Sequence, residues 1–368
     1  MSEKLIVKNF GPIKHVELDI KKVNVLIGEQ GTGKSALVRL LHLFHNQSFL
    51  FEDPYKFLDI FDFPFKKNTI LEYHSENYFI SYNEGKFNIR YKGQHLEILE
   101  KILVLSNKYL LEHDFKVENE YNSLNDWYLN NIGLSVYIPA ERIILPIIYK
   151  IPRIPNAPYI DYLGITYNQA RYKIKELDIP YLNQVKYKLE GDDDKIVLNN
   201  ETIFLHQTSS GFQASIPLAI IVESFTSRKE RFRFIIEEPE LNLFPATQNE
   251  LMKYLIEKTS QEKNGLFLAT HSPYILTSIN NMIFAEQVGK LDHEKTAGII
   301  EEKYWLNSND VSAYLLRYDE EAGGIIQENI MDDEVQQIKA EKIDEISRQF
   351  NREYDEMLDI KYPVSNEG

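Results

Sequence analysis

The segment Gly28–Ser35 constrains the fold of this chain more than any other stretch. It reads GEQGTGKS, follows the apolar run VNVLI and precedes ALVRLL, so the pattern predicts a loop between a strand and a helix. Glycines let successive backbone N–H groups converge on a phosphate with no Cβ in the way, and the helix that begins there adds the positive end of its dipole. We therefore expect a phosphate-binding loop, with a glycine-rich structural turn as the alternative.

Two side chains of this loop take defined roles at this spacing. Lys34 is expected to reach the β- and γ-phosphates of a nucleotide, and the Ser35 hydroxyl is expected to bind Mg²⁺. The loop residues predicted to contact ATP are Gly28, Gln30, Gly31, Thr32, Gly33, Lys34, Ser35 and Ala36.

Acidic residues and a histidine follow two later apolar runs. FRFII precedes Glu237 and Glu238, and LFLAT precedes His271. Ligands of α/β sheets bind at the carboxyl ends of the strands. Glu237 is therefore expected to hold Mg²⁺, and Glu238 to orient or deprotonate an attacking water. His271 is expected to contact the γ-phosphate, so Glu238 and His271 are the predicted catalytic residues. Taken alone, the acidic pair would more often begin a helix, and a lone histidine would more often be structural.

The remaining pattern predicts alternating strands and helices around an aromatic-rich insertion. Strand–helix alternation is typical of a parallel sheet with helices on its faces. The predicted strands are 4–10, 15–20, 23–28, 135–139, 232–236, 265–270 and 281–287, with hairpins over 78–91 and 189–205. The predicted helices follow residue 34 and cover 95–132, 160–190 and 335–358, while four prolines argue against regular structure over 145–158.

Composition limits the classes of protein that fit. The 368 residues include no cysteine, which excludes disulfides and thiolate metal sites, and no apolar run is long enough to span a membrane. We expect a cytoplasmic protein that does not associate with membranes. The net charge of −15 argues against charge-driven coating of DNA, and residues 319–368 hold 15 acidic and 5 basic side chains. A solvated acidic helix is expected there, with an acidic docking surface as the alternative.

The order of the motifs adds a family resemblance. The P-loop, then Ser-Ser-Gly-Phe-Gln at 209–213, then the acidic pair, then Thr-His-Ser-Pro resembles the ABC-type ATPase head, and more narrowly the RecF/SMC-like and OLD-type AAA ATPases. The resemblance implies an α/β P-loop NTPase fold with a mixed or parallel core sheet, flanking helices, an antiparallel β subdomain and a helical insertion. It places the core at 1–45 and 200–300, an insertion lobe at 46–199 and an acidic helical extension at 301–368.

The resemblance also implies a composite site. Two heads would sandwich two ATP molecules with Mg²⁺, and each ATP would touch the P-loop of one subunit and the signature of the other. The signature residues are Ser209, Ser210, Gly211 and Gln213, which could equally be a simple helix N-cap, and Asn242 and Leu243 would lie in the loop that crosses the interface. Asn9 and Phe10 would lie near the adenine. Glu141 and Arg142 lie where such heads place a γ-phosphate-sensing glutamine, or form a structural ion pair.

The function implied is a dimeric ATPase switch in antiphage defence or DNA maintenance. Its partners would be a second copy, a separate effector protein such as a nuclease, and DNA. An ATP-bound scaffold with little turnover is the alternative, because Glu237 stands where Asp is usual. A transporter subunit is disfavoured by the 176 residues between Lys34 and Ser210, and a built-in nuclease by the short C-terminal remainder. Asp332–Glu334 is expected to charge the first turn of a helix.

Overall fold

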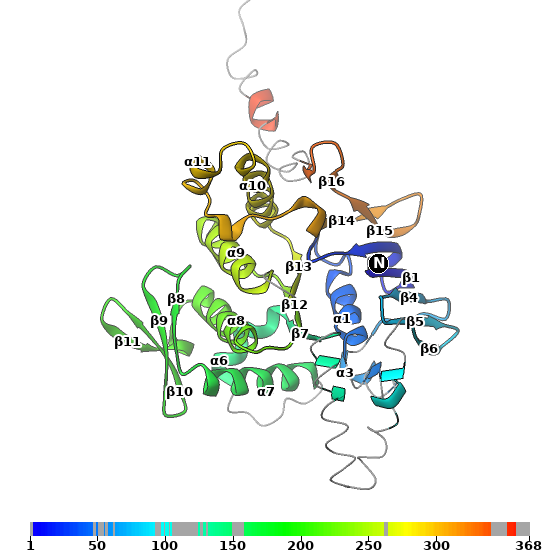
Figure 1. Cartoon of the computed structure of the whole chain (residues 1–368), viewed down its shortest axis with the longest axis horizontal. Coiled ribbons are helices and arrows are strands. Elements are labelled where there is room, and N and C mark those ends of the chain that lie inside the picture. Colours follow the sequence, from blue (N-terminus) through cyan, green and yellow to red (C-terminus); the bar gives the residue numbers. More distant parts are fainter. Residues whose placement is uncertain are drawn as a thin grey trace, which may run out of the picture.

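An eleven-stranded mixed sheet organises the chain, with helices on both faces (Figure 1). The computed structural model describes residues 3–46, 49–50, 55, 58–61, 63–92, 97–98, 100–102, 104, 124–125, 128–129, 132–148, 158–260, 264–339 and 352–357. The strand order across the sheet is β6 (Lys86–Tyr91), β5 (Tyr78–Asn83), β4 (Ile70–His74), β1 (Glu3–Phe10), β2 (Ile13–Ile20), β15 (Gly324–Asn329), β14 (Val311–Asp319), β3 (Val23–Gly28), β13 (Gly265–Thr270), β12 (Phe232–Glu237) and β7 (Leu134–Ile138).

Parallel pairing is concentrated in the half of the sheet that holds the phosphate-binding loop. Strands β14, β3, β13, β12 and β7 pair in parallel, whereas β1, β2, β4, β5 and β6 pair with one another antiparallel. All six residues of β3 and of β13 are buried, as parallel strands covered on both faces require. The predicted α/β fold with a mixed sheet and flanking helices is therefore confirmed.

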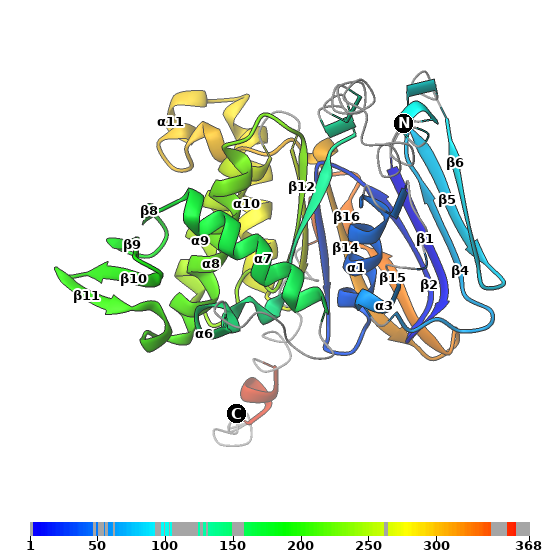
Figure 2. The same ribbon diagram turned by 90° about the horizontal axis from the view of Figure 1, so that it is seen from below.

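Helices cover the two faces of the parallel half. Figure 2 shows α1 on one side of β12 and α8, α9 and α10 on the other. The longer helices are α1 (Lys34–Phe44), α7 (Pro158–Lys173), α8 (Ser210–Thr226), α9 (Pro245–Thr259) and α10 (Pro273–Gly289). The shorter ones are α3 (Leu58–Phe61), α6 (Leu145–Ile148), α11 (His293–Ala297), η2 (Ala140–Ile144), η3 (Leu205–Gln207), η4 (Glu302–Tyr304) and η5 (Ser308–Asp310).

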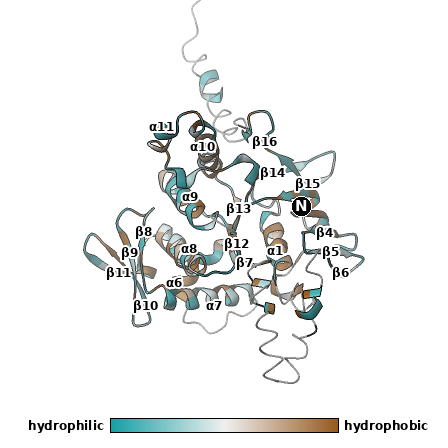
Figure 3. Cartoon of the chain, viewed as in Figure 1, coloured by the Kyte–Doolittle hydropathy of each residue, from teal (hydrophilic) through white to brown (hydrophobic). Residues whose placement is uncertain are grey.

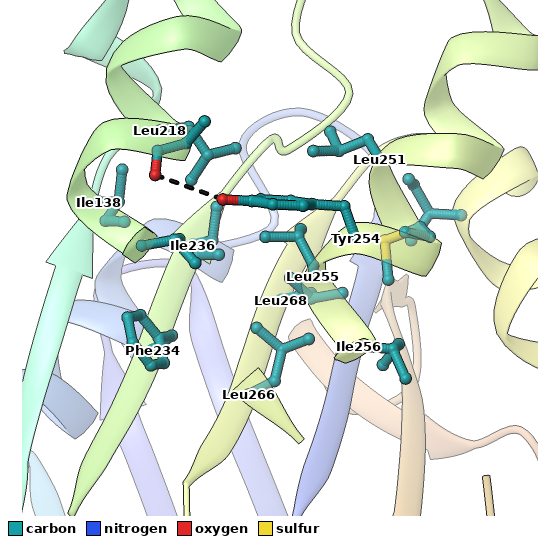
Figure 4. Packing of buried hydrophobic residues seen from close by; sticks show 14 of the residues in the cluster. Ile138, Leu218, Phe234, Ile236, Leu251, Tyr254, Leu255, Ile256, Leu266 and Leu268 are labelled. Atoms are coloured by element: carbon teal, nitrogen blue, oxygen red, sulfur yellow. Dashed lines mark hydrogen bonds between the residues drawn. The ribbon is translucent and has the colours of Figure 1, made fainter. Parts of the chain in front are cut away.

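Alternation along the central strands divides the core into two clusters. Phe234 and Ile236 of β12 pack with α8 and α9, while Ile235 between them packs on the α1 side. Figure 4 shows the first cluster, where the Tyr254 hydroxyl donates to the Ala219 carbonyl at 3.4 Å. Successive strand residues point to opposite faces, so the side chains of β12 contribute to both hydrophobic clusters. Helices α1 and α8 are correspondingly hydrophobic in Figure 3.

A second, four-stranded sheet lies beside α7. Its order is β11 (Glu201–Phe204), β10 (Asp193–Leu198), β9 (Val185–Glu190) and β8 (Glu176–Ile179), all antiparallel. Asp194 is buried and accepts hydrogen bonds from Arg171 Nε at 2.8 Å and from the hydroxyls of Tyr167 and Tyr187. A buried carboxylate needs such partners, and these tie α7 to the small sheet.

The domain division itself stays a prediction. Strands from all three predicted ranges pair within the large sheet: β7, from 46–199, pairs with β12, and β14, from 301–368, pairs with β3. The helical expectation for the extension is wrong over 311–329, which forms β14 and β15. Sequence reasoning missed these strands because the acidic composition favoured a solvated helix. In addition, the pairing of β14 with β3 joins segments that are distant in sequence.

Three further expectations for local structure are wrong. Residues 281–287 lie inside α10, where Pro273 at the first position and the Ser272 cap, which accepts from Tyr274 N, begin a helix. Helix α7 ends at Lys173, and β8 and β9 follow it. Part of the proline-rich segment is helical, since α6 holds Pro146 in its first turn, where a proline loses no hydrogen bond.

The C-terminal segment differs from the predicted helix at its start. A small hairpin of β16 (Met331–Asp332) and β17 (Gln337–Ile338) replaces it, and Asp332 Oδ1 accepts from the Glu334 and Val335 N–H groups in the turn. Asp332–Glu334 therefore stabilises a turn and does not begin a helix. Residues 352–357 are helical as predicted. Most of the helix predicted over 95–132, and residues 340–351, lie outside the described residues.

Candidate active site

The loop between β3 and α1 adopts the conformation that its glycines permit. Gly33 has φ 87° as the N-cap of α1, a left-handed conformation that favours glycine. Gly28 serves close packing, because a Cβ there would lie 2.5 Å from the Leu316 carbonyl oxygen of β14. The loop is thus fixed at both ends by backbone requirements.

Lys34 is buried inside the loop. Its ammonium donates to the carbonyls of Gly28 at 2.7 Å and Glu29 at 2.8 Å, and Nζ lies 3.4 Å from His271 Nδ1. Burial lowers the pKa of Lys34 to about 8, against the raising effect of carboxylates led by Glu238. An anion brought to this ammonium would replace solvent and stabilise its charge.

The Glu237 carboxylate at the end of β12 accepts hydrogen bonds on both oxygens. Ser35 Oγ donates to Oε2 at 2.6 Å, and the Tyr137 hydroxyl of β7 donates to Oε1. Arg39, one turn further along α1, places Nε 3.0 Å from the Tyr137 hydroxyl oxygen and 3.9 Å from Glu237 Oε1. Burial raises the pKa of Glu237, and the two hydroxyl donors oppose that effect.

Glu238 and His271 face each other across the ends of β12 and β13. Glu238 Oε1 lies 3.4 Å from His271 Nε2, and Glu238 has φ 42°. A non-glycine residue in that region is strained and needs surrounding structure to hold it. Glu240 fixes the histidine side of this pair, since its Oε1 accepts from His271 N at 2.9 Å and from Thr270 Oγ1 at 2.7 Å.

Arg142 holds the backbone of the acidic pair. Its fully buried guanidinium donates to the carbonyls of Glu237 at 2.7 Å and Glu238 at 2.6 Å, and to those of Pro139 and Ala214 at 3.0 Å. Arg142 is therefore a structural residue that links η2, β12 and α8. Its partners are carbonyl groups, and its neighbour Glu141 instead approaches Arg39 at 3.7 Å.

Most of these groups line one pocket of 510 Å³, whereas Gly28, Tyr137, Arg142 and Glu240 lie outside its lining. Its lining comprises Pro12, Gln30, Gly31, Thr32, Gly33, Lys34, Ser35, Ala36, Arg39, Phe61, Phe63, Pro64, Glu237, Glu238, Ala269 and His271. Residues 30–36 of the phosphate-binding loop, the acidic pair and His271, up to 241 residues apart in sequence, thus converge on one cavity. An apolar wall of Pro12, Phe61, Phe63 and Pro64 faces them.

Two residues predicted to lie near the adenine do not line this pocket. Phe10 is fully buried and packs its ring 6.1 Å from that of Phe63 and 5.4 Å from that of Phe65. Asn9 turns its side-chain amide to the Asn68 carbonyl at 3.3 Å. Strand alternation sends Phe10 into the core, so Phe63 stands between it and the pocket.

The predicted signature lies apart from the pocket, at the start of α8. Ser209 is its N-cap, and Ser209 and Ser210 are exposed. Gly211 lets α8 approach the next predicted segment, since a Cβ there would lie 2.8 Å from the Asn242 carbonyl oxygen. Asn242 is exposed, with Leu243 half-buried beside it, and Gln213 donates to the carbonyls of His206 and Thr208.

Comparison with known protein families shows to which family the chain belongs. The model of the AAA ATPase domain matches residues 1–140 and 158–276, well over half of the sequence. The chain belongs to the AAA ATPase domain family. The family is one of ATPases, and the pocket described above provides the polar groups that nucleotide binding requires.

Solved structures with a similar fold include heads of SMC proteins. The SMC head domain from Thermotoga maritima has a TM-score of 0.44 and 11% identity, covering 90% of this AAA ATPase and 99% of that chain. An SmcHead bound to the C-winged helix domain of ScpA has a TM-score of 0.42 and 12% identity, covering 89% and 96%. The Pyrococcus furiosus Smc head bound to the C-terminal domain of ScpA has a TM-score of 0.42 and 11% identity, covering 95% and 98%. No curated protein matches the chain.

The oxygen atoms at the Ser35–Glu237 contact suit a magnesium ion. Mg²⁺ prefers oxygen ligands and is usually held by one or two protein groups together with phosphate oxygens and waters. A hydroxyl and a carboxylate 2.6 Å apart beside the phosphate-binding loop meet that description. Among the described residues, no group of three or more His, Asp or Glu side chains could hold a metal ion unaided. Nor is any described helix long and apolar enough to cross a membrane.

Sequence reasoning missed Arg39, Tyr137, Phe61 and Phe63 as pocket or site residues. Arg39 had a local signal, because it lies four residues after Ser35 on the same helical face. Tyr137 lies two residues before the proline that ends its predicted strand, and only the pairing of β7 with β12 brings it to Glu237. The aromatic run FDFPF at 61–65 was visible, but its contact with the loop depends on the tertiary fold.

Proposed function

We propose that this AAA ATPase binds and hydrolyses ATP with Mg²⁺ as a nucleotide-driven switch. The supporting observation is the convergence of Lys34, the Ser35–Glu237 contact and the Glu238–His271 pair on one pocket. The loop offers backbone amides and an ammonium, and beside it a carboxylate lies close to a hydroxyl. This combination suits the triphosphate group of a nucleotide better than other ligands.

Each polar group has a distinct task in this proposal. Lys34 and the loop amides bind the phosphates, and Ser35 with Glu237 would hold Mg²⁺, which supplies charge neutralisation at the phosphate oxygens. Glu238 orients the attacking water and accepts its proton, while His271 reaches the terminal phosphate. Arg142 keeps Glu237 and Glu238 at the pocket by binding their carbonyls.

ATP turnover with the purified protein and Mg²⁺, measured with and without DNA, tests this function. Lys34→Ala should abolish nucleotide binding, and Glu238→Gln should bind ATP yet hydrolyse it slowly, by about a hundredfold or more for loss of a general base. A Glu238→Gln protein that turns over ATP at the wild-type rate would remove Glu238 from its assigned role.

A low-turnover, ATP-bound scaffold is the second candidate. Both oxygens of Glu237 already accept hydroxyl hydrogen bonds, and Glu237 is one methylene longer than the aspartate usual at this position. Tight ATP binding without turnover, by wild type and Glu238→Gln alike, would favour the scaffold over the enzyme.

The proposed assembly is a homodimer in which each ATP also touches the partner's signature. Ser209 and Ser210 are exposed at the N-terminus of the 17-residue helix α8, which can bind an anion, yet they do not line the pocket of their own chain. ATP can drive closure only through a higher affinity for the closed form. Asn242 and Leu243, packed beside Gly211, would lie at the same interface.

The proposed biological role is antiphage defence or DNA maintenance in the cytoplasm, with a separate effector such as a nuclease and with DNA as a further ligand. The support is the resemblance to RecF/SMC-like and OLD-type ATPases. Within residues 352–357, Tyr354 and Met357 are each 59% exposed, which leaves apolar surface for a partner. Affinity purification of Glu238→Gln with ATP from native cells should retain an effector or DNA; retention of neither would count against this role.

A further inference from the structure

Arg39 connects the proposed metal-holding carboxylate to a second one. Its guanidinium lies 3.9 Å from Glu237 and 3.7 Å from Glu141, and stacks 4.9 Å above the Tyr159 ring. Tyr159 in turn donates to Glu141 Oε1 at 2.9 Å. One cation from α1 therefore stands between carboxylates of β12 and η2.

Arg39 is the cation that approaches both of these carboxylates. Glu141 Oε2 is buried and accepts no hydrogen bond from the described residues. Arg39 itself donates one hydrogen bond to the described part of the chain, from Nε to Tyr137, and its side chain is 20% exposed. Arg39 also lines the pocket, where a guanidinium suits phosphate oxygens.

We propose that Arg39 is a positioning residue of the phosphate site, a resident cation that neutralises Glu237 and Glu141 and so sets how strongly Mg²⁺ promotes nucleotide binding. The inference rests on the proposed ATP-binding function. Without Arg39, two carboxylates would repel the polyphosphate, and an added divalent ion would have to supply the missing charge. Nucleotide affinity would then depend more steeply on Mg²⁺.

The test measures binding of the non-hydrolysable analogue AMP-PNP by calorimetry, in EDTA and in saturating Mg²⁺. Arg39→Gln removes the charge but can still hydrogen-bond to Tyr137. It should weaken binding about tenfold in EDTA and about threefold or less in Mg²⁺. Arg39→Lys keeps the charge and should preserve the wild-type gain from Mg²⁺. Arg90→Gln, at an exposed position of β6, is the matched control and should change neither value.

Glu141→Gln should have the opposite effect on nucleotide binding from Arg39→Gln. Removing one negative charge should tighten binding in EDTA and reduce the gain from Mg²⁺ below that of wild type. Equal losses in both conditions for Arg39→Gln, or an unchanged gain for both Arg39→Gln and Glu141→Gln, would overturn the inference. Failure of the wild-type protein to bind AMP-PNP in either condition would instead overturn the proposed function.

Discussion

Two glycines of the phosphate-binding loop have different structural requirements. A Cβ on Gly28 would lie 2.5 Å from the Leu316 carbonyl oxygen, which cannot retract because β14 pairs with β3 at that point. Gly31 has φ 78° and nothing within 4 Å of an added Cβ. The first position is limited by space and the second by backbone conformation alone.

Alanine substitutions should separate these two requirements. Gly28→Ala should lower the free energy of unfolding by about 2–3 kcal/mol through overpacking, and Gly31→Ala by about 1 kcal/mol through its left-handed backbone. Urea unfolding followed by tryptophan fluorescence measures both. Equal losses would mean that β14 moves away from β3 freely.

At this scale the sequence predicts which residues meet at the pocket where the pattern is local, while their roles stay predictions. Lys34 and Ser35 follow from an eight-residue pattern, and Glu237, Glu238 and His271 follow from their place after apolar runs. Asn9 and Phe10 do not line the pocket, and Phe61 and Phe63, which do, were missed, because a pocket wall depends on which distant segment packs against it.

Among the elements, η2 is tied to β12 and α8 by Arg142. Arg142→Met would remove four hydrogen bonds from a buried guanidinium to backbone carbonyls, so the free energy of unfolding should fall by about 3 kcal/mol or more. Since Glu238 would lose its anchor while Lys34 keeps its own contacts, kcat for ATP should fall more than nucleotide affinity. Comparing kcat with the Kd of AMP-PNP checks this, and equal losses in both would contradict it.

Helix α1 packs on β7 through a buried histidine. His42 stacks on Tyr137 at 5.4 Å, and its Nδ1 lies 2.7 Å from Ser135 Oγ. Burial lowers the pKa of His42 to about 3, with a smaller contribution from His45. The unfolded chain therefore binds the extra proton between pH 6.5 and 3, and the stability that His42 contributes is complete above pH 6.5 and is lost as pH falls through this window.

His42→Asn should remove that dependence while keeping a polar partner for Ser135. Between pH 7 and pH 5, wild type should lose about 2 kcal/mol more unfolding free energy than the variant. Urea unfolding at the two pH values measures the difference. Equal losses of unfolding free energy in the two proteins would show that protonation of His42 does not destabilise the folded state.

Element prediction succeeded where a periodic run was bounded by clear signals. The three N-terminal strands, the 78–91 hairpin and β12 and β13 follow directly from alternation or continuous apolar runs. The segment 281–287 was expected to be a strand because seven residues are too few to distinguish the helical period from the strand period. The buried residues of the whole helix α10 show the helical spacing, as in Ile275, Ile279, Met282 and Ile283. Strands β14 and β15 were missed although they pair with each other in a hairpin; their other partners, β3 and β2, lie about 300 residues away in sequence.

For the whole molecule, the decisive question is whether the signature of one copy completes the pocket of another. Ser210 is exposed and does not line the pocket of its own chain, so a bulky charged substitution there should leave the single chain folded and its Lys34 loop intact. Ser210→Arg should therefore bind AMP-PNP normally but neither dimerise with ATP nor hydrolyse it, as light scattering and turnover would show.

Mixing two inactive variants tests the composite site directly. In a twofold dimer each site takes Lys34 from one subunit and Ser210 from the other, so Lys34→Ala and Ser210→Arg, paired together, restore one intact site and leave the second with both defects. Since neither variant dimerises with itself, the dimers of an equal mixture are heterodimers with one intact site of two, and turnover should recover to at most about half of the wild-type rate. The double variant with both changes on one chain, mixed with either single variant, is the matched control, because no dimer in that mixture has an intact site. Turnover by Ser210→Arg alone at the wild-type rate would place hydrolysis within a single chain. No recovery in a mixture whose variants associate would contradict the composite site.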